Sequence, residues 1–143
     1  MTKTIQDPIL KKLLIQYGEG HLNNQNILLH NLGIPLIILG SIGILAKIPS
    51  PFPIEYVAGL LILFYYLSFK SIRTALVWIF QFAILFVLQR NIILDSILLW
   101  LFLAAIGWIL LGIGHKIEGS KPRFTEEIRM FLIGPIWIFR RFL

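Results

Sequence analysis

The chain has 143 residues, of which 57% are hydrophobic and only 14% are charged, and its mean hydropathy is +0.83. These values exclude an ordinary soluble domain and indicate an all-α integral membrane protein with one domain, residues 1–143. The absence of cysteine excludes disulfides and thiolate metal sites. With a net charge of +6, the chain is expected to interact with membrane lipid and not with nucleic acid.

The first expected element is an amphipathic helix at about residues 8–19. Asp7 is placed to cap this helix, and Pro8 suits its first position. Apolar side chains share one face and polar ones largely occupy the other, so we expect the helix to lie on the membrane surface. The apolar face consists of Ile9, Leu10, Leu13, Leu14 and Tyr17.

Four apolar segments follow, at about residues 26–46, 52–69, 74–89 and 91–114. A helix rises ~1.5 Å per residue, so about 20 residues cross a hydrocarbon core of about 30 Å. The second and third segments are short for a span, yet as one helix they would be far too long, so we expect a tight turn at residues 70–73. The sequence therefore predicts four transmembrane helices.

Lysine and arginine residues are distributed unevenly between the two sides of these spans. Three precede the first span, two lie in the second loop and six follow the fourth span, against Lys47 and Arg90 alone in the other two loops. Positively charged loops favour the cytoplasmic side. Both termini are therefore expected in the cytoplasm, with the membrane either a bacterial inner membrane or the endoplasmic reticulum. On the outer side we expect Asp95 to pair with Arg90.

A second short amphipathic helix, also expected at the membrane interface, is predicted at about residues 126–140. Thr125 is placed to cap it, and Gly134 with Pro135 should break it. Trp137 is expected to anchor the chain at the membrane interface. The helices at the two ends either tether the bundle or cover a site at the cytoplasmic face.

The three histidines, His21, His30 and His115, all lie where an expected span meets the cytoplasmic side. In one straight helix His21 and His30 would be about 13 Å apart on opposite faces. Asn23 or Asn24 can instead cap a new helix, so that the preceding segment folds back and His21 approaches His30. Polar side chains at membrane depth are costly and tend to be functional. This placement makes the chain a candidate metal enzyme.

His115 and Glu118 are three residues apart and project from one face if the helix continues past the membrane. Two histidines and one carboxylate are typical of non-haem iron sites that leave positions open for substrate and oxygen. Glu118 is expected either to bind the metal or to orient His115. Asn26 shares a helix face with His30. Tyr17 either donates a hydrogen bond to bound oxygen or substrate, or is an ordinary interfacial tyrosine.

Three cations, Lys116, Lys121 and Arg123, surround the end of the fourth span. They either steer an acidic head group toward the histidines or anchor the chain to anionic lipid. Two other functions fit the histidines. His30 and His115 on separate spans match the axial haem ligands of a four-helix electron-transfer protein. Histidines without a role would leave a non-catalytic membrane scaffold or lipid-binding protein.

The residues at the two ends of the chain form a pattern found in a known family. This pattern consists of Tyr17, His21, Asn26, His30, Gly33, Pro35, Trp108, Gly114, His115, Glu118, Gly119, Pro122, Gly134 and Pro135. It resembles the small multi-pass membrane family of the yeast 2-hydroxy fatty acid dioxygenase, which acts in the metabolism of phytosphingosine to odd-numbered fatty acids.

The resemblance implies an iron(II)-dependent dioxygenase that uses molecular oxygen to shorten a 2-hydroxy fatty acid by one carbon. His21, His30 and His115 match the histidines of the family, and Glu118, Asn26 or water would complete the coordination. The substrate carboxylate and 2-hydroxyl would chelate the iron at the cytoplasmic rim, and the C1–C2 bond would be cleaved oxidatively. The acyl tail would remain in the bilayer or between the spans.

Overall fold

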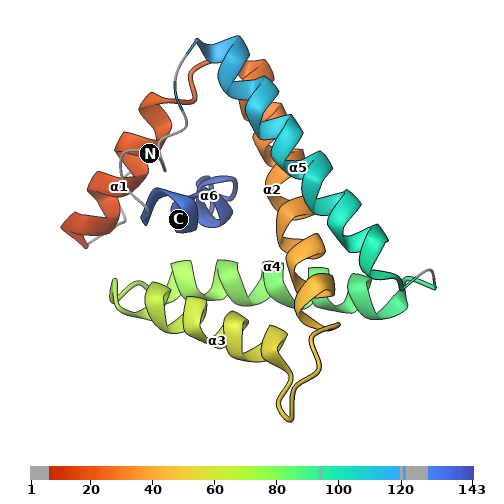
Figure 1. The fold of residues 1–143 in the computed structure, drawn as a ribbon. Helices are drawn as coiled ribbons and strands as arrows, with labels where there is room; N and C mark the ends of the chain where they lie inside the picture. Colours follow the sequence, from red (N-terminus) through yellow and green to blue (C-terminus); the bar gives the residue numbers. More distant parts are fainter. Residues whose placement is uncertain (1–6, 94, 120, 122–128) are drawn as a thin grey trace.

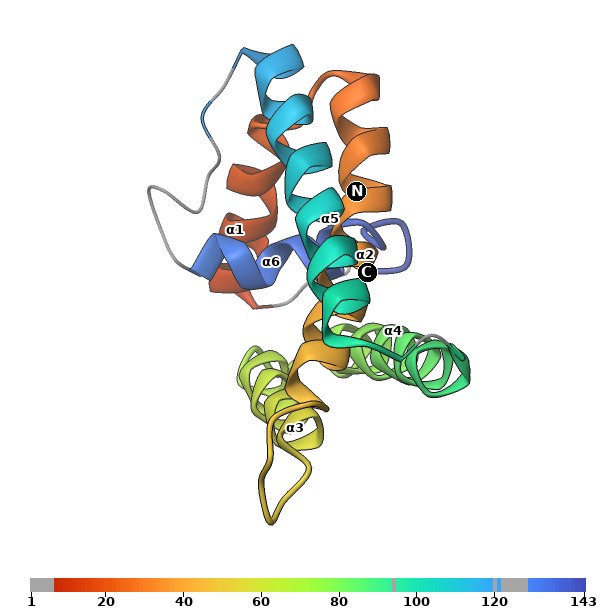
Figure 2. The ribbon, with the colours of Figure 1, turned by 45° about the vertical axis from the view of Figure 1, so that its right-hand side comes forward.

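The computed structural model describes residues 7–93, 95–119, 121 and 129–143. These residues form six helices and no strand, which confirms the predicted all-α class. The helices are α1 (Pro8–Glu19), α2 (Asn24–Leu45), α3 (Ile54–Leu67), α4 (Ile72–Asn91), α5 (Ile97–Glu118) and α6 (Arg129–Trp137). Figures 1 and 2 show α2 and α5 running side by side, with the α3–α4 hairpin lying across them at one end.

Glycine allows α2 and α5 to approach each other closely. A Cβ at Gly33 would lie 2.8 Å from the carbonyl oxygen of Gly107, and one at Gly107 would lie 2.7 Å from that of Gly33. Near the other end, the buried ring of Trp100 fills the space above Gly43, where a Cβ would meet the indole at 2.0 Å. Contact between backbones is the usual way in which helices associate in lipid. α2 and α5 are therefore closely packed against each other.

Three of the described helices are long and apolar enough to span a membrane: α2, α4 and α5, with 22, 20 and 22 residues. The prediction of four such helices is wrong, because α3 has only 14 residues and reaches about 21 Å at ~1.5 Å per residue. The expected segment 52–69 included residues that the structure places outside the helix. The fourth expected segment, 91–114, likewise begins later, since Ser96 caps α5 by accepting a hydrogen bond from the Leu99 amide at 3.2 Å.

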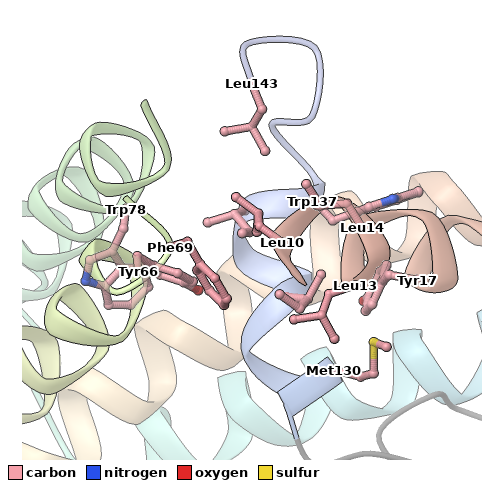
Figure 3. Close-up of a cluster of buried hydrophobic side chains, with 12 residues drawn as sticks. Leu10, Leu13, Leu14, Tyr17, Tyr66, Phe69, Trp78, Met130, Trp137 and Leu143 are labelled. Carbon is pink, nitrogen blue, oxygen red and sulfur yellow. The ribbon is translucent and has the colours of Figure 1, made fainter. Parts of the chain in front are cut away.

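The predicted start of α1 is confirmed, because Asp7 Oδ1 accepts a hydrogen bond from the Leu10 amide at 2.8 Å and Pro8 occupies the first turn. Four of the five residues of its apolar face, Leu10, Leu13, Leu14 and Tyr17, however, pack inside the protein, whereas Ile9 is exposed. Figure 3 shows this face meeting side chains of α6 and of the α3–α4 hairpin. The buried cluster contains Leu10, Leu13, Leu14, Tyr17, Tyr66, Phe69, Trp78, Met130, Ile133, Ile136, Trp137 and Leu143. An amphipathic pattern indicates that one face is covered, but the cover here is protein.

The C-terminal helix differs from its prediction in two respects. Gly134 and Pro135 do not break it, because α6 continues through both to Trp137. Trp137 is not an exposed interfacial anchor: it is buried, and the guanidinium of Arg140 lies 3.8 Å from the centre of its ring. Thr125 and the predicted start of this helix lie outside the described residues.

Two ion pairs tie the helices together at the end opposite the chain segment that carries His21. Asp95 Oδ2 lies 2.6 Å from Lys47 Nζ, and Arg90 Nη2 lies 2.9 Å from Glu55 Oε1. The predicted Asp95–Arg90 pair is therefore wrong. Because α2 and α5 are antiparallel neighbours, the end of α2 lies next to the start of α5, and Lys47 therefore meets Asp95. Arg90, near the end of α4, faces the start of α3 instead.

Candidate metal centre

The three histidines meet at the end of the α2–α5 pair formed by the start of α2 and the end of α5. One ligand nitrogen from each of His21, His30 and His115 lies within 4.8 Å of the other two, and all three side chains are buried. The Nε2 atoms of His30 and His115 are 3.3 Å apart. The ring of His21 packs edge to face against both others, with centroids 4.3 Å from His30 and 5.3 Å from His115.

A break between α1 and α2 brings His21 to His30. α1 ends at Glu19, and Asn23 caps α2 by accepting a hydrogen bond from the Gln25 amide at 2.8 Å. Only residues 20–23 connect the two helices, so the chain reverses over the start of α2. The predicted asparagine cap and the predicted approach of His21 to His30 are both confirmed.

Backbone carbonyls orient two of the imidazole rings. His21 Nδ1 donates a hydrogen bond to the Tyr17 carbonyl at 2.6 Å, and His30 Nδ1 donates to the Asn26 carbonyl at 3.0 Å. A carbonyl oxygen only accepts, so the proton of each neutral ring is on Nδ1 and the lone pair is on Nε2. This is the arrangement of metal-binding histidines, whose second nitrogen donates to a carbonyl or a carboxylate.

The Nε2 atoms then need a partner that accepts their lone pairs. Among the described residues, the buried Nε2 of His21 has no hydrogen-bond partner. The Nε2 atoms of His30 and His115 face each other, and a cation beside both takes the lone pair of His30 and, when the proton of His115 is on its unpartnered Nδ1, that of His115 as well. Two nitrogens bound to one metal at ~2.0–2.1 Å lie at most about 4 Å apart. The 3.3 Å separation of His30 and His115 falls within this range, and the three nitrogens, which lie within 4.8 Å of one another, need to close by about 1 Å at most. The donor set therefore suits a transition metal ion.

Burial favours the neutral form of His21. Loss of hydration lowers the pKa of this imidazole from its usual 6.5 to about 4, outweighing the hydrogen bond to the Tyr17 carbonyl, which acts in the opposite direction. Histidine binds metals only when it is neutral. The ring of His21 is therefore ready to bind a metal ion throughout the physiological pH range. Burial also raises the pKa of Tyr17 far above its usual value, so the phenol keeps its proton.

Glu118 connects the two segments that carry the histidines. Its Oε1 accepts a hydrogen bond from the Leu22 amide at 3.0 Å, and its Oε2 accepts from the Asn23 amide at 2.9 Å and from Asn26 Nδ2 at 3.0 Å. The cluster of potential ligands found among the described residues does not include this carboxylate. Of the two roles considered for Glu118, the geometry matches a positioning residue, which here orients the His21 segment more directly than it orients His115.

Asn26 and Gly114 fit closely beside the cluster. Asn26 Nδ2 also donates to the Gly20 carbonyl at 3.2 Å, so the amide group holds the reversal of the chain in place. Its Oδ1 faces Gly114, where a Cβ would come within 2.3 Å of it and within 3.2 Å of His30 Nδ1. A side chain at this position would displace the groups that orient His30.

Aromatic side chains enclose the cluster on the side of α1 and α6. The ring of Tyr17 stacks on His21 with centroids 4.3 Å apart and planes 6° from parallel. Trp137 contacts the same histidine, with ring centroids 4.9 Å apart. The sequence pattern included Tyr17 and the Gly134–Pro135 pair, but no signal in the sequence distinguished Trp137 from an interfacial anchor.

Of the three predicted head-group cations, the two that the structure describes are not part of the cluster. Lys116 and Lys121 are exposed and do not line the adjoining cavity, and Arg123 lies outside the described residues. Lys116 follows His115 directly, so its side chain is rotated about 100° around α5 from the buried histidine. This position matches that of a solvent- or lipid-facing cation.

An apolar cavity of about 220 Å³ begins at the histidines and continues between α2, α3, α4, α5 and α6. Its lining on α2 is one helical stripe: His30, Ile34, Ile37, Ile38, Ser41, Ile42 and Leu45. His30 and Leu45 are fifteen residues apart, so the lining extends about 22 Å along the helix. A bilayer leaflet provides about 15 Å of hydrocarbon for one acyl chain. The cavity therefore has the length and the polarity to hold a lipid tail whose head lies at the histidines.

Comparison with known proteins identifies the family of this chain. No curated protein and no solved structure matches the sequence. Residues 9–143 match the family described as "2-hydroxy-palmitic acid dioxygenase Mpo1-like". This match covers nearly the whole chain, including all three histidines, the segment that reverses between α1 and α2, and α6. The chain therefore belongs to the family of 2-hydroxy-palmitic acid dioxygenase Mpo1-like proteins.

Proposed function

We propose that this protein is an iron(II)-dependent dioxygenase that shortens 2-hydroxy fatty acids by one carbon. The observation that carries the proposal is the buried cluster of His21, His30 and His115 at the mouth of a cavity suited to an acyl tail. The family name supports the reaction class. In this reaction the bond between C1 and C2 of the substrate breaks, C2 becomes the carboxyl carbon of the product and C1 leaves as carbon dioxide. The two carbons lose four electrons in total, which molecular oxygen takes up, and one water is formed.

The three imidazoles would hold the iron through their Nε2 atoms. The Nε2 atom of His21 has no hydrogen-bond partner among the described residues, and those of His30 and His115 face each other. Ferrous iron would supply a Lewis acid for the 2-hydroxy acid and the electrons that activate molecular oxygen. The Tyr17 and Asn26 carbonyls keep the donor nitrogens of His21 and His30 in position. Three protein ligands leave positions for substrate and oxygen, and Glu118 is engaged elsewhere. The remaining candidates to complete the coordination are water and Asn26, whose buried Oδ1 has no hydrogen-bond partner among the described residues.

The remaining residues of the site would bind the substrate and exclude water. The acyl chain would enter the stripe of isoleucine side chains on α2, at a gain of about 0.8 kcal/mol for each buried methylene. Tyr17 and Trp137 cover His21 and limit access of water to the reacting carbons. The protonated Tyr17 hydroxyl, which lies beside Gly134 at the cavity wall, is positioned to donate a hydrogen bond to bound substrate.

We further propose that the protein is a single multi-pass membrane domain whose histidine cluster lies at the cytoplasmic face. The excess of lysine and arginine in the segments at that end of α2 and α5 supports this orientation. The haem-protein alternative is disfavoured by the geometry. That alternative would use His30 and His115 as the two haem ligands, whereas a third imidazole, that of His21, packs edge to face against both of these rings.

Turnover of the purified enzyme tests the proposal. The protein is purified without oxygen, loaded with iron(II) and incubated with 2-hydroxypalmitate and oxygen, and the acids are separated by chain length. We expect the acid that is one carbon shorter, formed by the wild type and by Lys116→Ala but not by His30→Ala. Bound iron without product across several tail lengths would contradict the proposed reaction, and would also support the non-catalytic alternative.

A further inference from the structure

The cavity that begins at the histidines ends at a pair of charged residues. Glu55 lines the cavity at the start of α3, and only 4% of its side chain is exposed. Its Oε1 accepts a hydrogen bond from Arg90 Nη2 at 2.9 Å. The guanidinium of Arg90 also lies 5.0 Å from the centre of the Phe86 ring, and half of the arginine side chain is exposed.

This ion pair lies at the far end of the cavity. On α2 the lining residue farthest from His30 is Leu45, in the last turn of the helix. The chain then passes through one loop into α3, where Glu55 is the second residue. Figures 1 and 2 show the start of α3 close to the end of α2, away from the end at which α2 begins. The polar histidines and the polar ion pair thus bound an apolar wall of about 22 Å.

The ion pair differs from the rest of the wall in how it meets an alkyl chain. Isoleucine side chains gain free energy from contact with a methyl group, but a buried carboxylate held by one arginine loses hydration when an apolar group covers it. Half of the Arg90 side chain is exposed, so the ion pair is hydrated on the arginine side. Glu55 is the member that lines the cavity, and an alkyl chain brought against it removes hydration from the carboxylate. A tail long enough to reach Glu55 therefore gains nothing from its last carbons.

We propose that the Glu55–Arg90 ion pair closes the cavity opposite the histidine cluster and sets the longest acyl chain that the protein binds. This inference rests on the proposed function for the position of the substrate head. Two small residues determine how much of the wall is usable. Ser41 lies eleven residues from His30, about 16 Å along α2. Ala58 lies one turn after Glu55 on α3. The side chains of Ser41 and Ala58 both line the cavity.

Binding to a series of saturated 2-hydroxy fatty acids of increasing length tests the inference. The acids displace a fluorescent fatty acid from metal-free protein in lipid nanodiscs. For the wild type, affinity should rise about fourfold with each added methylene, which corresponds to about 0.8 kcal/mol, and then stop rising at a limiting length. Ser41→Phe should move this limit to shorter acids. Glu55→Ala combined with Arg90→Ala should move it to longer ones.

Matched variants separate the ion pair from general effects on folding. Ala105→Phe adds a ring on an exposed position of α5 outside the cavity, and its limiting length should equal that of the wild type. Glu55→Gln keeps the size of the side chain but removes the ion pair, and should move the limit to longer acids by less than the double variant does, because a neutral amide loses less hydration than a carboxylate. Should Ser41→Phe fail to fold, Ala58→Phe fills the cavity from α3 and should shorten the limit instead.

The result distinguishes this inference from the proposed function. Limits that shift as described, in protein that never turns over the acids, uphold the ion pair as the end of the tail site while the dioxygenase proposal fails. Turnover with a limit that none of the cavity variants moves overturns the inference and leaves the proposed function standing. Affinity that keeps rising with chain length in the wild type also overturns it.

Discussion

Replacement of Glu118 by alanine should loosen the histidine cluster without removing a ligand. The carboxylate accepts three hydrogen bonds, from the amides of Leu22 and Asn23 and from Asn26 Nδ2. At a net value of about 0.5–1.5 kcal/mol each, and toward the lower end because Glu118 is half-buried, their loss costs about 1.5–3 kcal/mol in total. The segment that carries His21 is then no longer held against α5.

Metal affinity reports this loosening more directly than stability does. Residues that orient metal ligands typically contribute 10- to 100-fold to affinity, so we expect a decrease of about that size in iron(II) affinity for Glu118→Ala. His30→Ala, which removes a ligand, should abolish binding. The neighbouring exposed residue provides the control, since Lys116→Ala should bind iron as the wild type does. Anaerobic equilibrium dialysis measures all four proteins.

Two outcomes would refute this reasoning. An affinity unchanged from the wild type would mean that the hydrogen bonds of Glu118 do not hold His21 in place. Complete loss of binding, equal to that in His30→Ala, would mean that the carboxylate itself binds the metal.

The remaining predictions concern packing around the same cluster. Gly114→Ala places a methyl group 2.3 Å from Asn26 Oδ1, so it should cost about 1–3 kcal/mol of stability and weaken metal binding. The control is Gly112→Ala, whose methyl group meets nothing within 4 Å and should change neither property. Unfolding and dialysis measurements compare the two variants. Trp100→Ala empties the space above the α2 glycines and should lower the free energy of unfolding by about 3–5 kcal/mol; a loss below about 1 kcal/mol would contradict the packing described for this pair. Tyr17→Phe keeps the ring stacked on the histidine and should leave metal affinity unchanged while lowering the turnover rate; an unchanged rate would remove the hydroxyl from the proposed substrate contacts.

Local sequence signals predicted the histidine cluster well. The asparagine before α2 predicted the chain reversal, because its side chain offers the first amides of a helix an acceptor. Charge and hydropathy placed His30 and His115 at the same end of two neighbouring helices. Glu118 was recognised as part of the site, but spacing alone left open whether it binds metal or the backbone. Its three hydrogen-bond donors lie more than ninety residues away in the chain.

The features of the fold that could not be predicted depend on which helix surfaces pack against each other. The apolar pattern of residues 52–69 predicted a membrane span, but it determines neither the length of the helix nor its orientation, and the α3–α4 hairpin lies across α2 and α5 (Figures 1 and 2). The apolar face of α1 and the indole of Trp137 would look the same in sequence whether lipid or protein covered them. The ion pair of Asp95 with Lys47 joins the segment before α5 to the segment after α2, so proximity in sequence to Arg90 was misleading.

We propose that three imidazoles from separate segments of the chain hold one metal ion. The most direct test of this proposal is the iron(II) content, after anaerobic loading and removal of free metal, of the wild type and of His21→Ala, His30→Ala and His115→Ala. We expect one iron ion per chain in the wild type and loss of that ion in each of the three variants. Iron content that stays at the wild-type level after any of these substitutions would contradict it.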